Sequence, residues 1–303
     1  MTLPNLVVAG APKCGTSSLF RWLADHPDAC GSTPKETFYL MDEGHPLLRR
    51  GSNFHTRGIE GYAEFFDGCG GESRVVFEAT THYIYQRTAL EALSGLKTEP
   101  RIVFLLRKPS ERVYSSFRYS QNNPANVRRD LTFARFVELS KNGGGAELEE
   151  AAGASAFVLR NDIAFSRYVE YLTRWVERFG RERVHVLLFE DLKSNPRAFM
   201  KEFAARVRLD ASFYDSYGFP LKNETFGVRY PSLHKGVRKL NELVPAGGLK
   251  GALKRVYVKA QSGGTENGKS AEDARALEEL EREFRPFNRR LADELGLNLS
   301  AWE

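Results

Sequence analysis

Cysteine is scarce in this sequence: its 303 residues include three, Cys14, Cys30 and Cys69. Three cysteines are too few to build the disulfide framework of a small secreted domain, and free thiols are typical of proteins in a reducing compartment. We therefore expect three free thiols and a cytoplasmic protein.

Long apolar runs are missing as well. No stretch of about 18 consecutive apolar residues occurs, so we expect no membrane-spanning helix. The first residues lack the charged and apolar regions of a signal peptide and lead almost directly into a short strand-like run. Both observations favour a protein that stays in aqueous solution.

A large excess of charge of one sign is also absent. The 44 Lys and Arg against 39 Asp and Glu give a net charge of +5. This is too little for a protein that coats nucleic acid, and we expect no nucleic-acid partner. The charge is unevenly distributed, because residues 222–259 hold nine basic and two acidic side chains. Such a segment suggests an anionic ligand.

Apolar residues, by contrast, are plentiful. Hydrophobic residues make up 42% and aromatic residues 12% of the chain, which is enough for a core and excludes wholesale disorder. The length suits one α/β domain with long functional loops, so we expect a single domain over 1–303. Two stretches rich in glycine and small or polar residues, 141–156 and 261–269, are expected to be mobile loops.

Apolar runs alternate with helical patterns along the chain. We expect strands at 5–10, 74–78, 101–107 and 184–189, and helices at 15–26, 109–121, 162–179 and 196–206. The strand runs are continuously apolar, which is typical of strands covered on both faces. The alternation predicts an α/β fold with a central parallel sheet flanked by helices. A helical pattern also begins near residue 274, with a kink or restart expected at Pro286.

The turn after the first strand is the most informative segment. Four residues separate Gly10 from Gly15, as in the loop that binds nucleotide phosphates, but Thr16 stands where that loop has its lysine. The lysine of this turn is Lys13. Backbone amides at a helix amino terminus, with hydroxyls beside them, still form a cradle for a phosphate. We therefore expect a P-loop-like architecture that binds a nucleotide phosphate without a metal.

Five segments, in the same order along the chain, resemble those of sulfotransferases that use 3′-phosphoadenylyl sulfate (PAPS), in their bacterial and heparan-sulfate-type branches. These segments are 11–19 (Ala-Pro-Lys-Cys-Gly-Thr-Ser-Ser-Leu), 34–39 (Pro-Lys-Glu-Thr-Phe-Tyr), 77–83 (Phe-Glu-Ala-Thr-Thr-His-Tyr), 106–115 (Leu-Arg-Lys-Pro-Ser-Glu-Arg-Val-Tyr-Ser) and 189–192 (Phe-Glu-Asp-Leu), with Asn223 and Arg229 following. The similarity covers roughly residues 5–295. One such motif would be weak evidence, whereas five in order are specific.

The resemblance implies how the donor is held. Lys13 would neutralise the oxygen that bridges phosphorus and sulfur as that bond breaks, leaving 3′-phosphoadenosine 5′-phosphate (PAP) as product. The 5′-phosphate would be bound by the phosphate loop, that is by Lys13, Cys14, Gly15, Thr16, Ser17 and Ser18. Arg107 and Ser115 would bind the 3′-phosphate, because a guanidinium fork beside a hydroxyl suits a terminal phosphate. Arg229 and Lys235 would close over the nucleotide, although the lysine that the family has just before this point is missing.

The acceptor hydroxyl must lose its proton as it attacks sulfur, so a base is needed. The resemblance makes Glu78 the first candidate, and it follows a strand whose carboxyl end would face the ligand. His82, with an ordinary pKa nearer neutrality, is the second.

Four residues would contact the acceptor: Lys35, Glu36, His45 and His55. We expect the acceptor to be a carbohydrate, a lipid or a small metabolite, and the sequence carries no signal for an oligomeric state. Arg112 is left out of the site, with Glu111 or the surroundings of Glu78 as its expected partner.

Two other functions compete with sulfuryl transfer. A P-loop kinase or NTPase would have a lysine after Gly15 and a metal-binding aspartate closing a strand, and Asp191 follows a strand one residue late. A non-enzymatic anion-binding module would need the basic segment but not Lys13, Glu78 and Arg107 together.

Overall fold

The computed structural model describes residues 1–122, 126–220 and 269–303. The basic segment 222–259, with Arg229 and Lys235, lies outside the described residues, as does most of 261–269. The chain divides into two compact units. The first holds Met1–Lys108, Arg167–Lys222 and Arg285–Glu303, and the second holds Pro109–Ser166 and Asn223–Phe284. The single domain expected over 1–303 stays a prediction.

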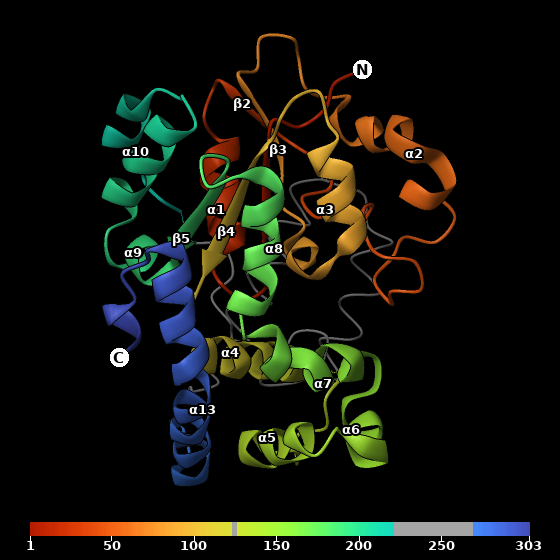
Figure 1. Ribbon diagram of the computed structural model, residues 1–303, viewed down its shortest axis with the longest axis vertical. Helices are drawn as coiled ribbons and strands as arrows, with labels where there is room; N and C mark the ends of the chain where they lie inside the picture. Colours follow the sequence, from red (N-terminus) through yellow and green to blue (C-terminus); the bar gives the residue numbers. More distant parts are fainter. Residues whose placement is uncertain (123–125, 221–268) are drawn as a thin grey trace, which may run out of the picture. The chain divides into compact units, whose positions relative to one another are not determined.

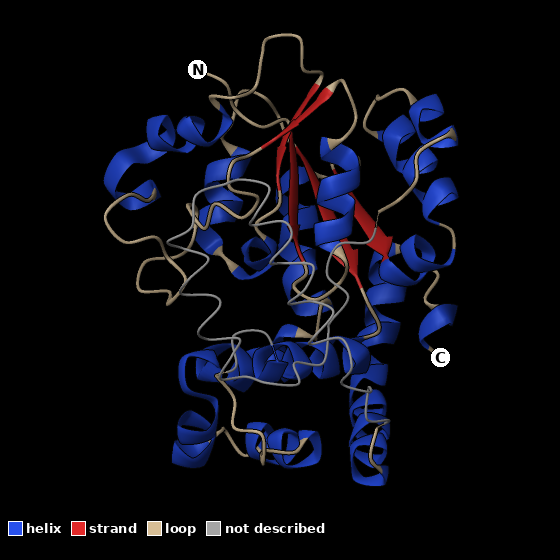
Figure 2. Ribbon diagram, turned by 180° about the vertical axis from the view of Figure 1, so that it is seen from behind, coloured by secondary structure: helices blue, strands red, loops and turns tan. Residues whose placement is uncertain are grey.

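The first unit is built on a sheet of five parallel strands in the order β2-β3-β1-β4-β5 (Figures 1 and 2). The strands are β1 (Leu6–Gly10), β2 (Ala29–Gly31), β3 (Val75–Glu78), β4 (Arg101–Leu106) and β5 (Val184–Leu188). The four strands expected from apolar runs are confirmed, and so is the α/β fold. Only β2 was missed, because three half-buried residues, Ala-Cys-Gly, make no apolar run.

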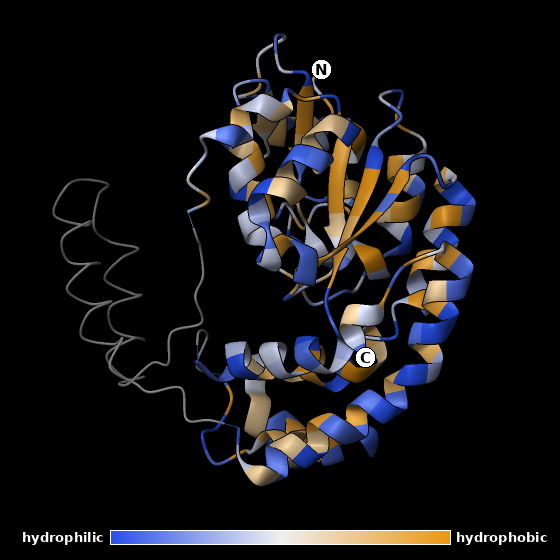
Figure 3. Cartoon of the chain, turned by 90° about the vertical axis from the view of Figure 1, so that its left-hand side faces the viewer, coloured by the Kyte–Doolittle hydropathy of each residue, from blue (hydrophilic) through white to orange (hydrophobic). Residues whose placement is uncertain are grey.

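Helices cover both faces of this sheet. α1 lies on one face and α8 on the other, as Figures 1 and 2 show from opposite sides. The helices of this unit are α1 (Thr16–Ala24), α2 (Phe54–Ala63), α3 (Arg87–Ser94), α8 (Val169–Phe179), α9 (Phe189–Ser194) and α10 (Pro196–Arg206), with 3₁₀ turns η1 (Glu64–Phe66), η2 (Thr81–Tyr85), η4 (Ala211–Asp215) and η5 (Ser300–Trp302). The strands between them are mostly apolar (Figure 3), as a doubly covered sheet requires, and their charged or polar residues are Glu78, Arg101 and His185.

Local signals fix several helix ends. Asn195 caps α10, because its side-chain oxygen accepts a hydrogen bond from the Ala198 amide at 3.1 Å. Pro196 stands at the first helical position, where its missing N–H costs nothing. The predicted helix 196–206 is therefore confirmed at both ends. The predicted helix 162–179 is instead two helices, interrupted at residues 166–168.

The second unit is helical. It contains α4 (Pro109–Asn122), α5 (Phe133–Lys141), α6 (Gly145–Ala152), η3 (Gly153–Ser155) and α7 (Ala156–Phe165), and α13 (Ala271–Leu295) begins in it and ends in the first unit. Its core includes stacked Phe117 and Phe136, whose ring centroids are 5.2 Å apart. The stretch 141–156, expected to be a loop, holds α6, whose Leu148 is buried in this core. α13 runs through Pro286 without the restart expected there.

Arg112 and Asp162 form a buried ion pair in the second unit. The Arg112 side chain is 1% exposed and that of Asp162 is 0% exposed, with Nη2 and Oδ1 2.9 Å apart. Arg112 Nε also donates to Ser166 Oγ at 2.8 Å. The partner expected for Arg112, Glu111 or the surroundings of Glu78, is therefore wrong, because an aspartate on α7, three helices later in the chain, pairs with the guanidinium.

Two of the three cysteines are joined. A disulfide links Cys30, on β2, to Cys69, which follows η1. The expectation of three free thiols is wrong, since Cys14 alone has a free, buried thiol. Because two cysteines form a disulfide, the cysteines no longer indicate a reducing compartment, and cytoplasmic localisation stays a prediction. In the described part of the chain, no helix has the length and apolarity needed to cross a bilayer.

Candidate active site

The carboxyl ends of the parallel strands meet at one edge of the sheet. The phosphate loop, residues 13–18, follows β1 and leads into α1, and Glu78 ends β3. β1 is the central strand, with β2 and β3 on one side and β4 and β5 on the other. Parallel α/β sheets bind ligands at this edge, where the strand order reverses. The phosphate loop and Glu78 therefore lie where such a fold binds its ligands.

The phosphate loop has a conformation that demands its glycine. Gly15 caps α1 with φ +87°, and Lys13 also has a left-handed φ of +68°. A Cβ at Gly15 would lie 2.7 Å from Cδ2 of Phe189, so no other residue fits there. Turns with left-handed residues point successive amides toward one place, and α1 adds its first-turn N–H groups. The fit to a phosphate group expected from the sequence is therefore supported by the backbone itself.

The hydroxyl residues and Cys14 take different places in the loop. Thr16 opens α1 and is buried, while Ser17 and Ser18 are half-buried in the same first turn. The Cys14 thiol faces inward, 3.6 Å from the Tyr168 hydroxyl. The Tyr168 hydroxyl donates to the Arg107 carbonyl oxygen at 2.9 Å. Cys14 therefore offers a ligand its backbone, and its side chain joins the loop to the end of β4.

Glu78 ends β3 with no exposed surface. Its Oε2 accepts hydrogen bonds from Thr80 Oγ1 at 2.6 Å and Thr37 Oγ1 at 3.1 Å. The Tyr62 hydroxyl donates to Oε1. Burial raises the pKa of Glu78 to about 7, and the hydrogen bonds from the surrounding hydroxyls oppose that rise. A carboxyl with a pKa near neutrality is suited to accept a proton at physiological pH.

The hydroxyls around Glu78 form a closed network. The Tyr83 hydroxyl lies 2.8 Å from Thr37 Oγ1 and accepts a hydrogen bond from the Leu40 amide at 3.1 Å. Burial, and then the charge of Glu78, raise the pKa values of Tyr62 and Tyr83 well above normal, so both stay neutral donors. Sequence reasoning gave no role to Thr37, Tyr62, Thr80 or Tyr83. Thr80 and Tyr83 stand in the motif that contains Glu78, whereas Tyr62 carries no sequence signal.

Lys35 is held against the strand end that carries Glu78. Its Nζ donates to Glu36 Oε1 at 2.7 Å and to the Ala79 carbonyl oxygen at 3.2 Å. The Ala79 amide in turn donates to the Lys35 carbonyl oxygen at 3.2 Å. Lys35 and Glu36 are thus placed next to the candidate base, and contact with an acceptor stays a prediction.

The structure brings together two of the three histidines proposed for the site. The rings of His82, on η2, and His45 have centroids 6.3 Å apart. His82 is buried, and burial lowers the pKa of His45. His55 is exposed on α2, with Nε2 3.0 Å from the Met41 carbonyl oxygen.

Arg107 follows β4, and its guanidinium lies over the Phe189 ring, 5.0 Å from the centroid. The same ring closes on Gly15, so it contacts both the loop and Arg107. Ser115 is half-buried on α4, in the second unit. Arg229 and Lys235 lie outside the described residues.

Comparison with known proteins decides the family. The sequence model of the sulfotransferase domain matches residues 3–205. The chain belongs to the sulfotransferase family. A solved sulfotransferase from Alicyclobacillus acidocaldarius has the same fold, with a TM-score of 0.64 at 22% identity, covering 100% of this chain and 99% of that one.

Several curated relatives are longer sulfotransferases. A bifunctional heparan sulfate N-deacetylase/N-sulfotransferase of Caenorhabditis elegans is 23% identical over 78% of this chain, which spans 28% of that protein. A mouse protein of the same description is 26% identical over 66% of this chain and 22% of its own length. The membrane-associated sulfotransferase kil1 of Dictyostelium discoideum is 23% identical over 67% of this chain and 55% of its own length. This sulfotransferase is thus an enzyme of sulfuryl transfer, and neither competing function is favoured.

Proposed function

We propose that this sulfotransferase moves the sulfuryl group from PAPS to an acceptor hydroxyl, with Glu78 as base and Lys13 stabilising the leaving group. The observation that carries the proposal is the pairing of β1 with β3, in which Val7 lies opposite Glu78. The phosphate loop and the carboxyl with a pKa of about 7 therefore follow neighbouring strands at one edge. A phosphosulfate bound by the loop would have a proton acceptor beside it.

The reaction needs one bond made and one broken. The acceptor oxygen attacks sulfur in line as the bond from sulfur to the phosphate oxygen breaks, and PAP leaves with the negative charge on that oxygen. Lys13 would meet this charge as it develops, where a fixed cation lowers the barrier most. The acceptor proton would pass to the Glu78 carboxylate. Because that carboxylate has no exposed surface, one of the hydroxyls bonded to it must move aside or relay the proton.

We infer a carbohydrate acceptor ahead of a lipid or a small metabolite. The support is that curated relatives include proteins described as heparan sulfate N-sulfotransferases. Lys35 and Glu36, beside the Glu78 strand end, together with His45 would meet the sugar, with His55 further out on α2. Arg107 and Ser115 would bind the 3′-phosphate, Arg229 and Lys235 would close over the nucleotide, and no metal enters this proposal.

Transfer of labelled sulfate from PAPS to a panel of hydroxylated acceptors, read out by product mass, tests this proposal. We expect PAP to bind with micromolar affinity without Mg²⁺ and ATP to bind much more weakly, because the lysine that clamps a triphosphate is replaced by Thr16. Lys13→Ala should lower turnover tenfold or more while weakening PAP less. If ATP bound as tightly as PAP, or if binding depended strictly on a metal ion, PAPS would be rejected as the donor.

Mutations should distinguish the binding site of the 3′-phosphate from that of the 5′-phosphate. Arg107→Ala and Ser115→Ala should weaken PAP by roughly tenfold to a hundredfold, the scale of a lost charge-assisted hydrogen bond. Binding of adenosine 5′-phosphosulfate, which has no 3′-phosphate, should barely change. Calorimetric titration of both ligands checks this. If both weakened alike, Arg107 would be a support for the Phe189 ring rather than a phosphate ligand.

A further inference from the structure

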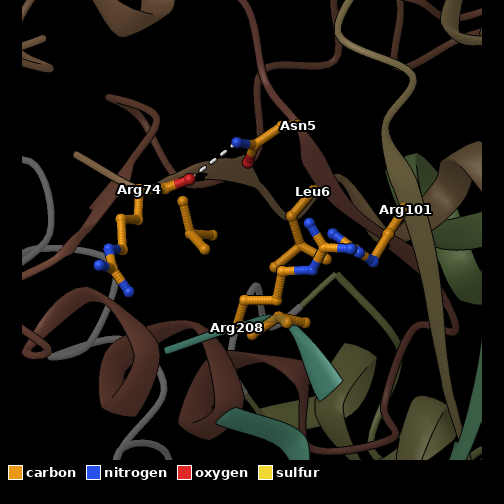
Figure 4. A pocket seen from close by; sticks show the side chains of 7 residues that line it. Asn5, Leu6, Arg74, Arg101 and Arg208 are labelled. Atoms are coloured by element: carbon orange, nitrogen blue, oxygen red, sulfur yellow. Dashed lines mark hydrogen bonds between the residues drawn. The ribbon is translucent and has the colours of Figure 1, made fainter. Parts of the chain in front are cut away.

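A pocket lined by arginines and apolar residues lies at the opposite edge of the sheet from the phosphate loop. It occupies about 280 Å³ at the amino ends of β1, β3 and β4, within the first unit (Figure 4). Three arginines line it: Arg74, just before β3, Arg101, the first residue of β4, and Arg208, shortly after α10. In Figure 4 the side chains of Arg101 and Arg208 approach each other, and Arg74 stands across the pocket.

These three guanidinium groups have no carboxylate partner among the residues that the structure describes. Four other arginines of the same unit are paired, in Arg21–Asp25, Arg57–Glu64, Arg87–Glu91 and Arg206–Glu202. The side chains of Arg101 and Arg208 approach each other without a counter-charge, so their like charges repel, and an anion between them relieves that repulsion.

A neighbouring histidine reports the local positive charge. The pKa of His185, on β5 next to β4, is lowered first by burial and then by the charges of Arg101 and Arg206. Of these two arginines, Arg101 lines the pocket, so its positive charge also acts on a residue of the neighbouring strand.

The described lining residues include no carboxylate that would repel an anion. Leu6, Val75 and Val207 are buried apolar residues. The Asn5 side chain is already used, because Nδ2 donates to the Arg74 carbonyl oxygen at 2.8 Å and Oδ1 accepts from the Val76 amide at 3.1 Å. These bonds join the start of β1 to β3, so the wall is fixed while the guanidinium groups remain available.

We propose that this pocket binds a tetrahedral oxyanion, a sulfate or phosphate group, through Arg74, Arg101 and Arg208. Guanidinium groups match the oxygens of such groups in pairs. The volume of about 280 Å³ is just under the range of roughly 300–1,000 Å³ typical of pockets for drug-sized ligands, and so fits a single small group. The site is separate from the donor site, because it lies at the amino ends of the strands and the phosphate loop follows a carboxyl end.

Titration with sodium sulfate at constant ionic strength, in saturating PAP, tests the proposal. We expect Arg101→Gln/Arg208→Gln to bind sulfate at least tenfold more weakly than wild type, the loss expected for removing two charge-assisted contacts. Arg21→Gln/Arg87→Gln removes the same charge from exposed arginines of the same unit and should bind like wild type. The phosphate loop is the same in the wild type and both double variants. Any sulfate bound there therefore contributes equally to the three titrations, whether or not PAP occupies the loop.

A second variant guards against loss of folding. Arg101→Glu supplies a carboxylate beside Arg208, so it should keep or raise the Tm in sulfate-free buffer and abolish the sulfate-dependent rise in Tm. An unchanged sulfate response in this variant or in Arg101→Gln/Arg208→Gln overturns the proposal. Competition by a sulfated oligosaccharide, with its unsulfated form as control, separates a sulfo group on a glycan from the free anion as the natural source.

Discussion

Replacing Glu78 with glutamine is expected to lower turnover by about 100-fold or more, the usual scale for a lost general base, while PAP affinity stays nearly intact. Glutamine keeps the size of the side chain. Its amide oxygen, in the place of Oε2, can still accept hydrogen bonds from Thr37 and Thr80, while its NH2 group, in the place of Oε1, can donate to the Tyr62 hydroxyl. It cannot take a proton from the acceptor. Turnover at saturating acceptor, measured beside a PAP titration, checks both halves of this expectation.

His82→Ala is the matched comparison. His82 lies on the 3₁₀ turn that follows the Glu78 strand, so its loss should cost less if it only lines the acceptor site. A severe loss in His82→Ala with a mild one in Glu78→Gln would make the histidine the base. Near-full turnover in Glu78→Gln would remove the carboxyl from the catalytic residues.

The raised pKa of Glu78 also predicts how the stability of Glu78→Gln differs from that of the wild type as the pH changes. Burial raises this pKa to about 7 in the folded protein, above its ordinary value of 4.5, so the folded state holds the proton more tightly than the unfolded chain. The stability contributed by the group is complete below about pH 4.5 and is lost as the pH rises through about 7. Glutamine does not titrate, so Glu78→Gln should gain roughly 3 kcal/mol in unfolding free energy relative to wild type across this range. Urea unfolding at several pH values measures it.

Removing one partner of the Arg112–Asp162 pair is expected to cost about 3–5 kcal/mol of unfolding free energy, because it leaves an uncompensated buried charge. Both side chains are almost fully buried, so water cannot replace the lost partner. Urea unfolding of Arg112→Ala and Asp162→Ala checks this value.

Arg135→Ala is the control in the same unit. Arg135 pairs with Glu147 at the surface, with both side chains about half exposed, and such pairs contribute about 0–1 kcal/mol. Equal losses in Arg112→Ala and Arg135→Ala would show that burial of the ion pair does not determine its contribution.

Local patterns in the sequence predict the frame of this protein well. The apolar runs predict β1, β3, β4 and β5, and the helical pattern over 196–206 predicts α10. The spacing of Gly10 and Gly15 predicts a strand, a turn and a helix in that order. Each of these features depends on residues close together in the chain, which is why the sequence reveals them.

Contacts between distant residues are what the sequence did not reveal. Tyr62 reaches Glu78 from 16 residues away, and Arg112 meets Asp162 across 50. The disulfide joins cysteines 39 residues apart. No periodicity or spacing rule connects such residues, because the fold alone brings them together. The prediction that failed for the cysteines rested on their number, which says nothing about their positions.

The disulfide turns part of the site into a covalent ring. The chain from Cys30 to Cys69 contains Lys35, Thr37 and Tyr62, while Glu78 lies outside it. Closing a loop of 39 residues restricts the unfolded chain by about 4 kcal/mol in the loop-entropy model. When the protein unfolds, the ring keeps the donors of Thr37 and Tyr62 tethered near each other and to the end of the sheet that must receive Glu78. Proteolytic cleavage after the exposed Arg49 or Arg50 would therefore leave two fragments that the disulfide still joins.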